Sequence, residues 1–283
     1  MAARGELADA DRERLQQAMD KLDNANRAAI AAAESHEVDM IAGTIRRVAA
    51  GAACVAPETD AARRDREHAN AERNRATSER MVRERLAVLR RDVGERLCPS
   101  SATLDRFVEY DAAQAATLAA LRDFMAEIRA RVANGDGLLL IGPPGTGKDM
   151  LAIATARHAV IHAGVTARWM DCATFRAALR DSFSSKGGEQ RLIEPWVRAG
   201  VLVMSDPVSP GAALTDFQAE ALFRIIDGRW RRKRPTYVTA NFSGEAAAAE
   251  AMGSQTLDRL SDGALRLRCV WESYRTRKRK AKK

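Results

Sequence analysis

The sequence predicts an α/β fold, in which a parallel β-sheet carries helices on both faces and an all-α N-terminal arm precedes it. Three observations predict this fold. From about residue 100 onward, short apolar runs alternate with helical patterns, a glycine-rich loop follows the first of these runs, and residues 1–97 contain few strand-forming residues. The 283 residues, 46% of them hydrophobic, are enough for one sizeable core and an appendage.

Residues 1–97 predict a helical arm or hairpin rather than a compact domain. Apolar residues at helical spacing are interrupted near Gly51 and Pro57, and a stretch of charges of alternating sign follows. An early helical seam consists of Leu15, Met19, Leu22, Asn26 and Ala29, and a later apolar face consists of Val82, Leu86, Leu89 and Val93. Since such a thin seam is poorly covered alone, we expect the arm to bind a partner, with a plain linker helix as the alternative.

Residues 98–274 predict a single α/β domain, and residues 275–283 form a basic tail. Five apolar or β-rich runs are the candidate strands, and helical patterns separate the first four. These runs are LLLIG (138–142), VTARWM (165–170), GVLVM (200–204), TYVTAN (236–241) and ALRLRCVW (264–271). Strands that alternate with helices in this way are typical of a parallel sheet.

The net charge of +8 is concentrated in the tail, because the last nine residues contain seven basic residues and no acidic one. Such a segment can attract the phosphates of a nucleic acid, with a strong dependence on salt. A disordered, solubilising end is the alternative interpretation.

Composition also excludes several classes of protein. The four cysteines, Cys54, Cys98, Cys172 and Cys269, form no C-x-x-C pair, which argues against a zinc site or a disulfide framework. No apolar run approaches the roughly 18 residues that a membrane span requires, and the N-terminus has no signal-peptide core. We therefore expect a cytoplasmic protein with no membrane contact.

The glycine-rich loop is the strongest motif. Gly142, Pro143, Pro144, Gly145, Thr146, Gly147 and Lys148 follow an apolar strand and precede a helical pattern. In this context backbone amides and the helix N-terminus bind phosphate groups, and the lysine reaches the β- and γ-phosphates. The sequence therefore predicts a P-loop that binds ATP with Mg²⁺.

Asp149 departs from the P-loop pattern, which requires Ser or Thr after the lysine to bind Mg²⁺. A second departure occurs at Ser205-Asp206, where a strand ends and two acids are expected. Our hypothesis is a reciprocal swap, in which Asp149 supplies the carboxylate, Ser205 the hydroxyl and Asp206 the acid that orients the attacking water. All three are then candidate metal-site residues. The alternative is a weakened metal site that binds nucleotide but hydrolyses it slowly.

Three further polar residues are candidates for the same chemistry. Asn241 follows a strand, where it can hold the attacking water, and Arg259 and Arg275 can stabilise phosphate charge. Taken singly, each arginine is also compatible with an ordinary surface role.

In order and spacing, GPPGTGKDMLA, VLVMSDP, KRPTYVTANFS and LDRLSDGALRLRCVWESYR resemble the bacterial replicative helicase loaders of the DnaC type and the related IstB transposition helper ATPases. Both groups are AAA+ proteins. The resemblance covers roughly residues 100–275 and implies an AAA+ P-loop NTPase domain with a truncated lid.

The resemblance also implies roles for residues. Lys148 matches the Walker A lysine, Asp206 the second Walker B acid and Asn241 the sensor 1 residue. Arg259 matches an arginine finger, which acts on the ATP of a neighbouring subunit, and Arg275 matches the sensor 2 arginine. These roles imply a homo-oligomeric ring or spiral, a helicase-binding arm at residues 1–97 and ATP-dependent contact with single-stranded DNA.

Two segments are candidates for DNA contact. Residues 229–234 contain five basic residues around Trp230, although cations also favour the end of a helix. Residues 182–190 form a polar, glycine-containing stretch with Lys186, near the element that binds DNA in the resemblance.

Three functions remain open at this point. The first is a helicase loader, which binds a hexameric replicative helicase and single-stranded DNA and is a weak ATPase. The second is a helper that acts on duplex DNA with a transposase. The third is a nucleotide-binding adaptor with little hydrolysis. The P-loop is common to all three, while the arm favours the first.

Overall fold

The computed structural model describes Lys21 and residues 59–94, 102–182, 188–208 and 213–280. The chain divides into two compact units, Met1–Arg73 and Asn74–Lys283. The second unit begins inside α2 (Asp60–Val93), whereas the sequence predicts that the sheet domain starts at residue 98. The early helical seam of the predicted arm, which includes Leu15 and Leu22, lies outside the described residues.

A five-stranded parallel sheet in the order β2-β3-β4-β1-β5 forms the centre of the second unit. Its strands are β1 (Leu138–Ile141), β2 (Ala167–Asp171), β3 (Val201–Ser205), β4 (Thr236–Ala240) and β5 (Leu265–Arg268). Each lies within one of the five predicted runs or shifts from it by a residue, so the predicted parallel sheet is confirmed.

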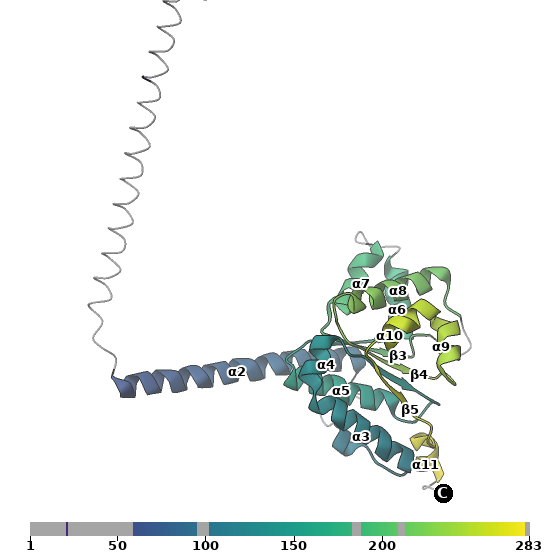
Figure 1. The fold of residues 1–283 in the computed structure, drawn as a ribbon, viewed down its shortest axis with the longest axis horizontal. Helices are drawn as coiled ribbons and strands as arrows, with labels where there is room; N and C mark the ends of the chain where they lie inside the picture. Colours follow the sequence, from purple (N-terminus) through teal and green to yellow (C-terminus); the bar gives the residue numbers. More distant parts are fainter. Residues whose placement is uncertain (1–20, 22–58, 95–101, 183–187, 209–212, 281–283) are drawn as a thin grey trace, which may run out of the picture. The chain divides into compact units, whose positions relative to one another are not determined.

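Helices cover both faces of this sheet (Figure 1). The order of the helical elements along the chain is α2, η1 (Leu104–Arg106), α3 (Ala112–Ala126), α4 (Ile128–Asn134), α5 (Lys148–His162), α6 (Cys172–Ser182), α7 (Gly188–Arg198), α8 (Asp216–Trp230), α9 (Glu245–Met252), α10 (Ser254–Ser261) and α11 (Tyr274–Lys280). No helix within the described ranges is both long enough and apolar enough to span a membrane.

Successive side chains of each strand point to opposite faces of the sheet, so the core consists of two layers. Leu138 and Leu140 of β1 point into a cluster with α3 and α5, while Leu139 points into a second cluster with α6 to α10. Because successive side chains of a strand face opposite sides, strands that are apolar throughout require this double cover.

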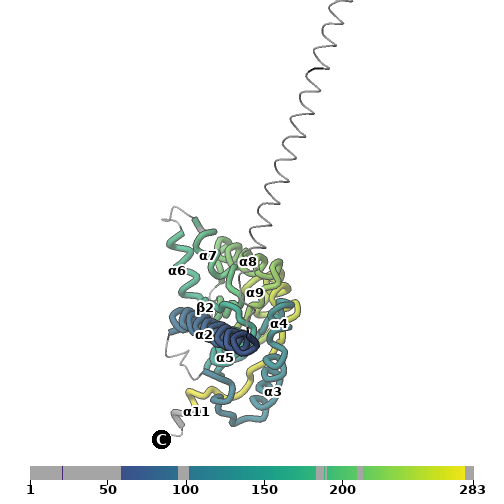
Figure 2. The backbone as a smooth tube through the Cα atoms, turned by 90° about the vertical axis from the view of Figure 1, so that its left-hand side faces the viewer, coloured from purple at the N-terminus to yellow at the C-terminus, as the bar shows by residue number. Residues whose placement is uncertain are grey.

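The last part of α2 belongs to the first of these clusters. Leu89 is fully buried, and Leu86 and Val93 pack against the same cluster. Arg85 donates to the carbonyl of Gly164, and Arg168 of the edge strand β2 forms an ion pair with Asp92. Figure 2 shows this end of α2 beside β2 and α5. The later apolar face thus packs on the sheet domain.

Candidate nucleotide site

The P-loop connects the carboxyl end of β1 to α5, as the motif predicts. Gly145 and Gly147 have φ angles of 85° and 89°, in the left-handed region that glycine adopts readily. Gly147 is the N-cap of α5, so the loop leads directly into the helix N-terminus. Thr146 is buried, and its hydroxyl donates to the carbonyl of Pro143 at 3.0 Å. Backbone amides at a helix N-terminus are suited to bind phosphate.

Lys148 lies inside this cradle. Its Nζ donates to the carbonyls of Gly142 and Pro143, both at 2.9 Å, and to Oδ1 of Asn241 at 2.8 Å. Burial lowers the pKa of Lys148 from its usual value, although the nearby carboxylate of Asp206 opposes the shift. The structure thus brings together the predicted Walker A lysine and the predicted sensor 1 asparagine.

Asp149 lies opposite the end of β3, and the structure brings it together with Ser205. The Ser205 hydroxyl donates to Oδ1 of Asp149 at 2.9 Å. The same oxygen accepts a hydrogen bond from Thr239 Oγ1 at 2.5 Å. Thr239 was not predicted from the sequence, because its register with Ser205 on the neighbouring strand β3 is visible only in the structure. The hydroxyl–carboxylate pairing required by a reciprocal swap is therefore present in the geometry.

Asp206 follows β3 directly and adopts a φ of 42°, a conformation that is strained for a residue other than glycine. Asn241 Nδ2 donates to its Oδ2 at 2.7 Å. Burial raises the pKa of Asp206, and the charge of Asp149 raises it further, while Lys148 opposes the shift. The strained backbone places this carboxyl beside both the lysine and the asparagine.

The side-chain oxygens of Asp149, Ser205 and Asp206 are suitable ligands for a magnesium ion that also binds phosphate groups. No cluster of three or more His, Cys, Asp or Glu side chains that could enclose a metal occurs among the described residues. Magnesium, however, is commonly held by only one or two carboxylates together with water and substrate phosphates. Asp149, Asp206 and Ser205 provide two carboxylates and a hydroxyl of this kind.

The segment after β5 packs directly on the P-loop. Trp271 Nε1 donates to the carbonyl of Thr146 at 2.9 Å, and the backbone amide of Tyr274 donates to the carbonyl of Gly145 at 3.0 Å. A Cβ atom on Gly145 would come within 2.1 Å of the Ser273 hydroxyl. Since the Ser273 hydroxyl could rotate away from such an atom, the φ angle of Gly145 is the stronger reason for glycine at this position.

A cavity of about 260 Å³ lies beside the loop, between η1 and α11. Phe107, Tyr110 and Arg275 contribute to its walls, together with residues of the P-loop. The Tyr110 hydroxyl donates to the carbonyl of Glu272 at 2.6 Å, which joins the entry segment to the C-terminal segment. Aromatic walls next to a phosphate cradle suit a nucleoside. Phe107 and Tyr110 were missed because no motif marks them.

The structure separates the two predicted arginines. Arg275 is exposed in α11 on the wall of this cavity. Arg259 lies in α10 and lines another cavity, which is formed by residues just before β1, β4 and β5. In a parallel sheet this amino edge lies opposite the carboxyl edge that carries the P-loop. Arg259 is therefore remote from the P-loop of its own chain.

The first DNA-contact segment requires a correction. Arg229 is fully buried and cannot contact DNA, and burial lowers its pKa to about 9. Its guanidinium donates to the carbonyls of Trp196, Val197, Ala199, Gly200 and Pro235 and to the Thr236 hydroxyl. Arg231, Arg232 and Lys233 are exposed.

In the second candidate segment for DNA contact, residues 183–187 lie outside the described residues, and Lys186 is among them.

The second unit is similar to a known protein family. A family model described as "IstB-like ATP binding protein" matches residues 74–282, which is nearly the whole second unit. No curated protein sequence matches the chain significantly.

Several solved structures share the fold. The DnaC helicase loader is 24% identical with a TM-score of 0.55, and the match covers 62% of this chain and 99% of that one. DnaI is 19% identical with a TM-score of 0.50, and the match covers 59% of this chain and 90% of the DnaI chain. The replication initiator DnaA bound to AMPPCP and single-stranded DNA is 15% identical with a TM-score of 0.50. This match covers 66% of this chain and 55% of the DnaA chain. These matches confirm the predicted AAA+ P-loop fold.

Proposed function

Because the chain belongs to the IstB-like ATP-binding protein family, we propose that it is an ATP-controlled helicase loader. In this proposal it binds a hexameric replicative helicase through the N-terminal arm and delivers it to single-stranded DNA. The adenine nucleotide occupies the P-loop and the neighbouring aromatic cavity. Assembly of several copies is the step that the nucleotide controls.

One observation carries the assembly part of the proposal. Lys148 lies at the carboxyl edge of the sheet and Arg259 at the amino edge, and β1 between these edges contributes four residues, or roughly 13 Å. Arg259 therefore cannot serve the nucleotide of its own chain. If it stabilises a phosphate at all, that phosphate belongs to another copy, and repetition of such a contact builds a ring or an open spiral.

The residues around the loop have distinct roles in this proposal. The P-loop amides and Lys148 hold the phosphates, and Asp149 and Ser205 form the carboxylate–hydroxyl pair beside them. When bound, magnesium neutralises charge on the β- and γ-phosphates. Asp206 and Asn241, joined by a 2.7 Å hydrogen bond, orient the water that attacks the γ-phosphate. We expect hydrolysis to be slow, because Asp149 replaces the usual P-loop hydroxyl and Ser205 replaces the first acid expected at the end of β3.

The choice of partner rests on the comparisons. The solved structure with the highest TM-score quoted above is a helicase loader, and 99% of its chain is matched. The DnaA structure binds single-stranded DNA. These relatives support a replicative helicase and single-stranded DNA as the partners, and the basic tail and Arg231, Arg232 and Lys233 supply candidate phosphate contacts.

The description of the matching family favours a second candidate, an IstB-like transposition helper that acts on duplex DNA with a transposase. The two candidates differ in the form of DNA that ATP makes the protein bind. Titration of a labelled single strand and of the matching duplex, each with ATP and Mg²⁺, separates them. Tighter ATP-dependent binding to the duplex would favour the helper.

Mass photometry of the full chain, with and without ATP and Mg²⁺, tests the nucleotide control. We expect larger assemblies with ATP than with ADP, and their loss in Lys148→Ala, whose fold is checked by its melting temperature. Assembly of a well-folded Lys148→Ala variant with ATP would refute the assigned site. Assembly with ATP but without phosphate release would identify an adaptor with little hydrolysis.

A further inference from the structure

Arg259 lies in a built environment rather than on an open surface. Its Nε donates to Oδ1 of Asp227 at 2.7 Å, across the contact between α10 and α8. Its guanidinium carbon lies 4.8 Å from the ring centroid of Phe223 and 5.1 Å from that of Trp230. Only 22% of the Arg259 side chain is exposed. A long, flexible side chain is thereby restricted to one orientation.

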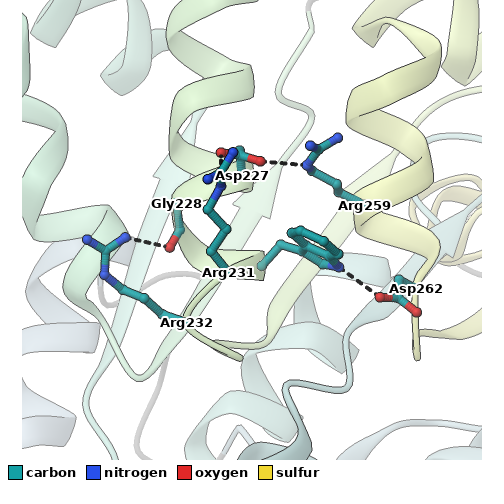
Figure 3. A network of polar contacts seen from close by, with 7 residues as sticks. Asp227, Gly228, Arg231, Arg232, Arg259 and Asp262 are labelled. Atoms are coloured by element: carbon teal, nitrogen blue, oxygen red, sulfur yellow. Dashed lines mark hydrogen bonds and ion pairs between the residues drawn. The ribbon is translucent and has the colours of Figure 1, made fainter.

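The two groups that hold Arg259 are themselves held (Figure 3). Asp227 accepts at its second oxygen, Oδ2, from Arg231 Nε at 2.7 Å. Trp230 donates from its indole Nε1 to Oδ2 of Asp262 at 2.7 Å, which fixes the ring that faces the guanidinium. The carboxylate and the aromatic ring therefore have defined positions before any partner arrives.

The contact with Asp227 uses the inner nitrogen of the guanidinium. Within the described part of the chain, the terminal nitrogens Nη1 and Nη2 of Arg259 have no hydrogen-bond partner. A carboxylate that sequesters an arginine typically accepts from its terminal nitrogens in a bidentate pair. Here those donors stay available, and Figure 3 marks a contact of Asp227 with the inner nitrogen alone.

Arg259 lines a cavity of about 470 Å³ at the amino edge of the sheet, which Arg231, Lys233 and Arg234 also line. Two acidic residues, Asp136 and Asp262, line it as well, and Asp136 forms an ion pair with Arg131 while Asp262 is engaged by Trp230. Positive groups thus dominate the side chains that can meet an anion here.

We propose that Asp227 and Trp230 are positioning residues, which aim the terminal nitrogens of Arg259 at the nucleotide phosphates of a neighbouring copy. This inference rests on the proposed function and adds to it the device that fixes the arginine. Asp227 orients the guanidinium through Nε, and the Trp230 ring sets its plane. Preorganisation of this kind removes much of the entropy cost of ordering an arginine during assembly.

The test compares ATP-dependent assembly of four full-length variants by mass photometry: Arg259→Ala, Asp227→Asn, Trp230→Leu and Glu194→Gln. We expect loss of assembly in Arg259→Ala and a roughly tenfold weaker assembly in Asp227→Asn and Trp230→Leu. Glu194→Gln is the matched control, because Glu194 also accepts from an arginine four residues later, Arg198 in α7. It should assemble like the original chain.

A mixing experiment distinguishes positioning from general damage to the fold. Asp227→Asn keeps an intact P-loop but has a misaimed arginine, whereas Lys148→Ala keeps the arginine but has lost the P-loop lysine. At concentrations where the original chain just assembles, neither should assemble alone with ATP. A mixture should form a complex of one copy of each and nothing larger, since it contains only one competent junction. A variant that has merely lost its fold would not be rescued.

The possible results distinguish failure of the positioning role from failure of the proposed function. If Arg259→Ala assembles like the original chain, the arginine does not act between copies, and the proposed function fails together with the inference. If Arg259→Ala fails but Asp227→Asn and Trp230→Leu assemble normally, only the inference is overturned. Stronger assembly of Asp227→Asn would mean that Asp227 sequesters Arg259, which also overturns it.

Discussion

Asp149 occupies the position where a P-loop usually carries a hydroxyl, and Ser205 occupies a position where a carboxylate is usual. The structure joins them by a 2.9 Å hydrogen bond and adds Thr239 as a second donor to the same oxygen. The pair was foreseeable because the residue after the P-loop lysine and the end of the Walker B strand face each other. Thr239 was not foreseeable, because a threonine within a β-rich run is equally typical of an ordinary strand.

Reversal of the pair tests whether the two positions are coupled. Asp149→Ser leaves only hydroxyls at the contact, and Ser205→Asp places a second carboxylate against Asp149. We expect each single variant to lose roughly tenfold in Mg²⁺-dependent ATP hydrolysis, and the double variant to recover. Phosphate release is measured under saturating ATP. Single variants that hydrolyse ATP as well as the double variant would show that the positions are independent.

Asp206 links the site to stability. Its pKa is raised, so the folded protein holds the proton more strongly than the unfolded chain does, and the stabilisation by the proton is lost as pH rises through the folded pKa. At neutral pH the buried carboxylate therefore costs stability. Asp206→Asn should therefore unfold at a higher urea concentration than the original chain at pH 7. The gain should vanish at pH values below about 3.8, the ordinary pKa.

Urea unfolding of both chains at several pH values measures this difference. Asn at position 206 can still accept the hydrogen bond from Asn241, so the comparison isolates the charge. A destabilised Asp206→Asn variant at pH 7 would mean that attraction to Lys148 outweighs burial, which is the opposite of the expected balance.

Arg229 shows where single-residue interpretation from sequence fails. Five basic residues in a run of six predict an exposed cationic patch, yet one of the five is fully buried. Its guanidinium donates hydrogen bonds to the carbonyls of Trp196, Val197 and Ala199, at and just beyond the end of α7. Carbonyls at this end of a helix have no partner within the helix. Sequence alone does not reveal which arginine of a run faces the core.

At the scale of elements, the C-terminal segment is a structural part of the nucleotide site. Trp271 and Tyr274 donate to carbonyls of the P-loop, and Arg277 lies 4.5 Å from the ring centroid of Tyr110. Charge alone predicts only a basic tail at residues 275–283. The structure forms a helix, α11, over Tyr274–Lys280, and this helix provides a wall of the cavity beside the loop.

Two truncations separate the contacts of α11 from its charge. Ending the chain after Ser273 removes the hydrogen bond to Gly145 and the Tyr274 and Arg275 side chains, so nucleotide affinity should fall by roughly tenfold. Ending it after Arg277 keeps these contacts and should leave the affinity near its original value. Titration with a fluorescent ATP analogue measures both. Equal affinities would show that α11 is not part of the site.

α2 illustrates why boundaries between domains were harder to predict than elements. The apolar seam through Leu89 was visible in the sequence, but periodicity does not say which core a seam packs against. The structure packs it against the sheet cluster, and both the second compact unit and the family match begin at Asn74. We therefore propose that the partner-binding arm lies before Asn74.

At the scale of the whole molecule, the sheet was predictable because its five strands are short, apolar or β-rich, and separated by loops or helices. The order of the strands was not predictable in the same way, since crossovers of similar length fit several arrangements. The phosphate cradle was predictable for a different reason, as a contiguous motif carries it. The cavity with Phe107 and Tyr110 was not, because it joins segments more than 150 residues apart in the chain, such as Tyr110 and Glu272.

In the proposed function, nucleotide binding is linked to the assembly of several copies. Each copy presents a phosphate cradle at one edge of its sheet and Arg259 at the other. We therefore propose that the nucleotide between copies controls whether the loader grips or releases the helicase, because a ligand that favours one assembled state shifts the equilibrium toward it.

Native mass spectrometry of the full chain, mixed with the replicative helicase of its host in the presence of ATP and Mg²⁺, tests this account most directly. We expect a stable complex that contains one helicase hexamer and several copies of this chain, and we expect this complex to be lost when Lys148→Ala replaces the original chain. Absence of any complex with the helicase, together with ATP-dependent binding to duplex DNA, would contradict it.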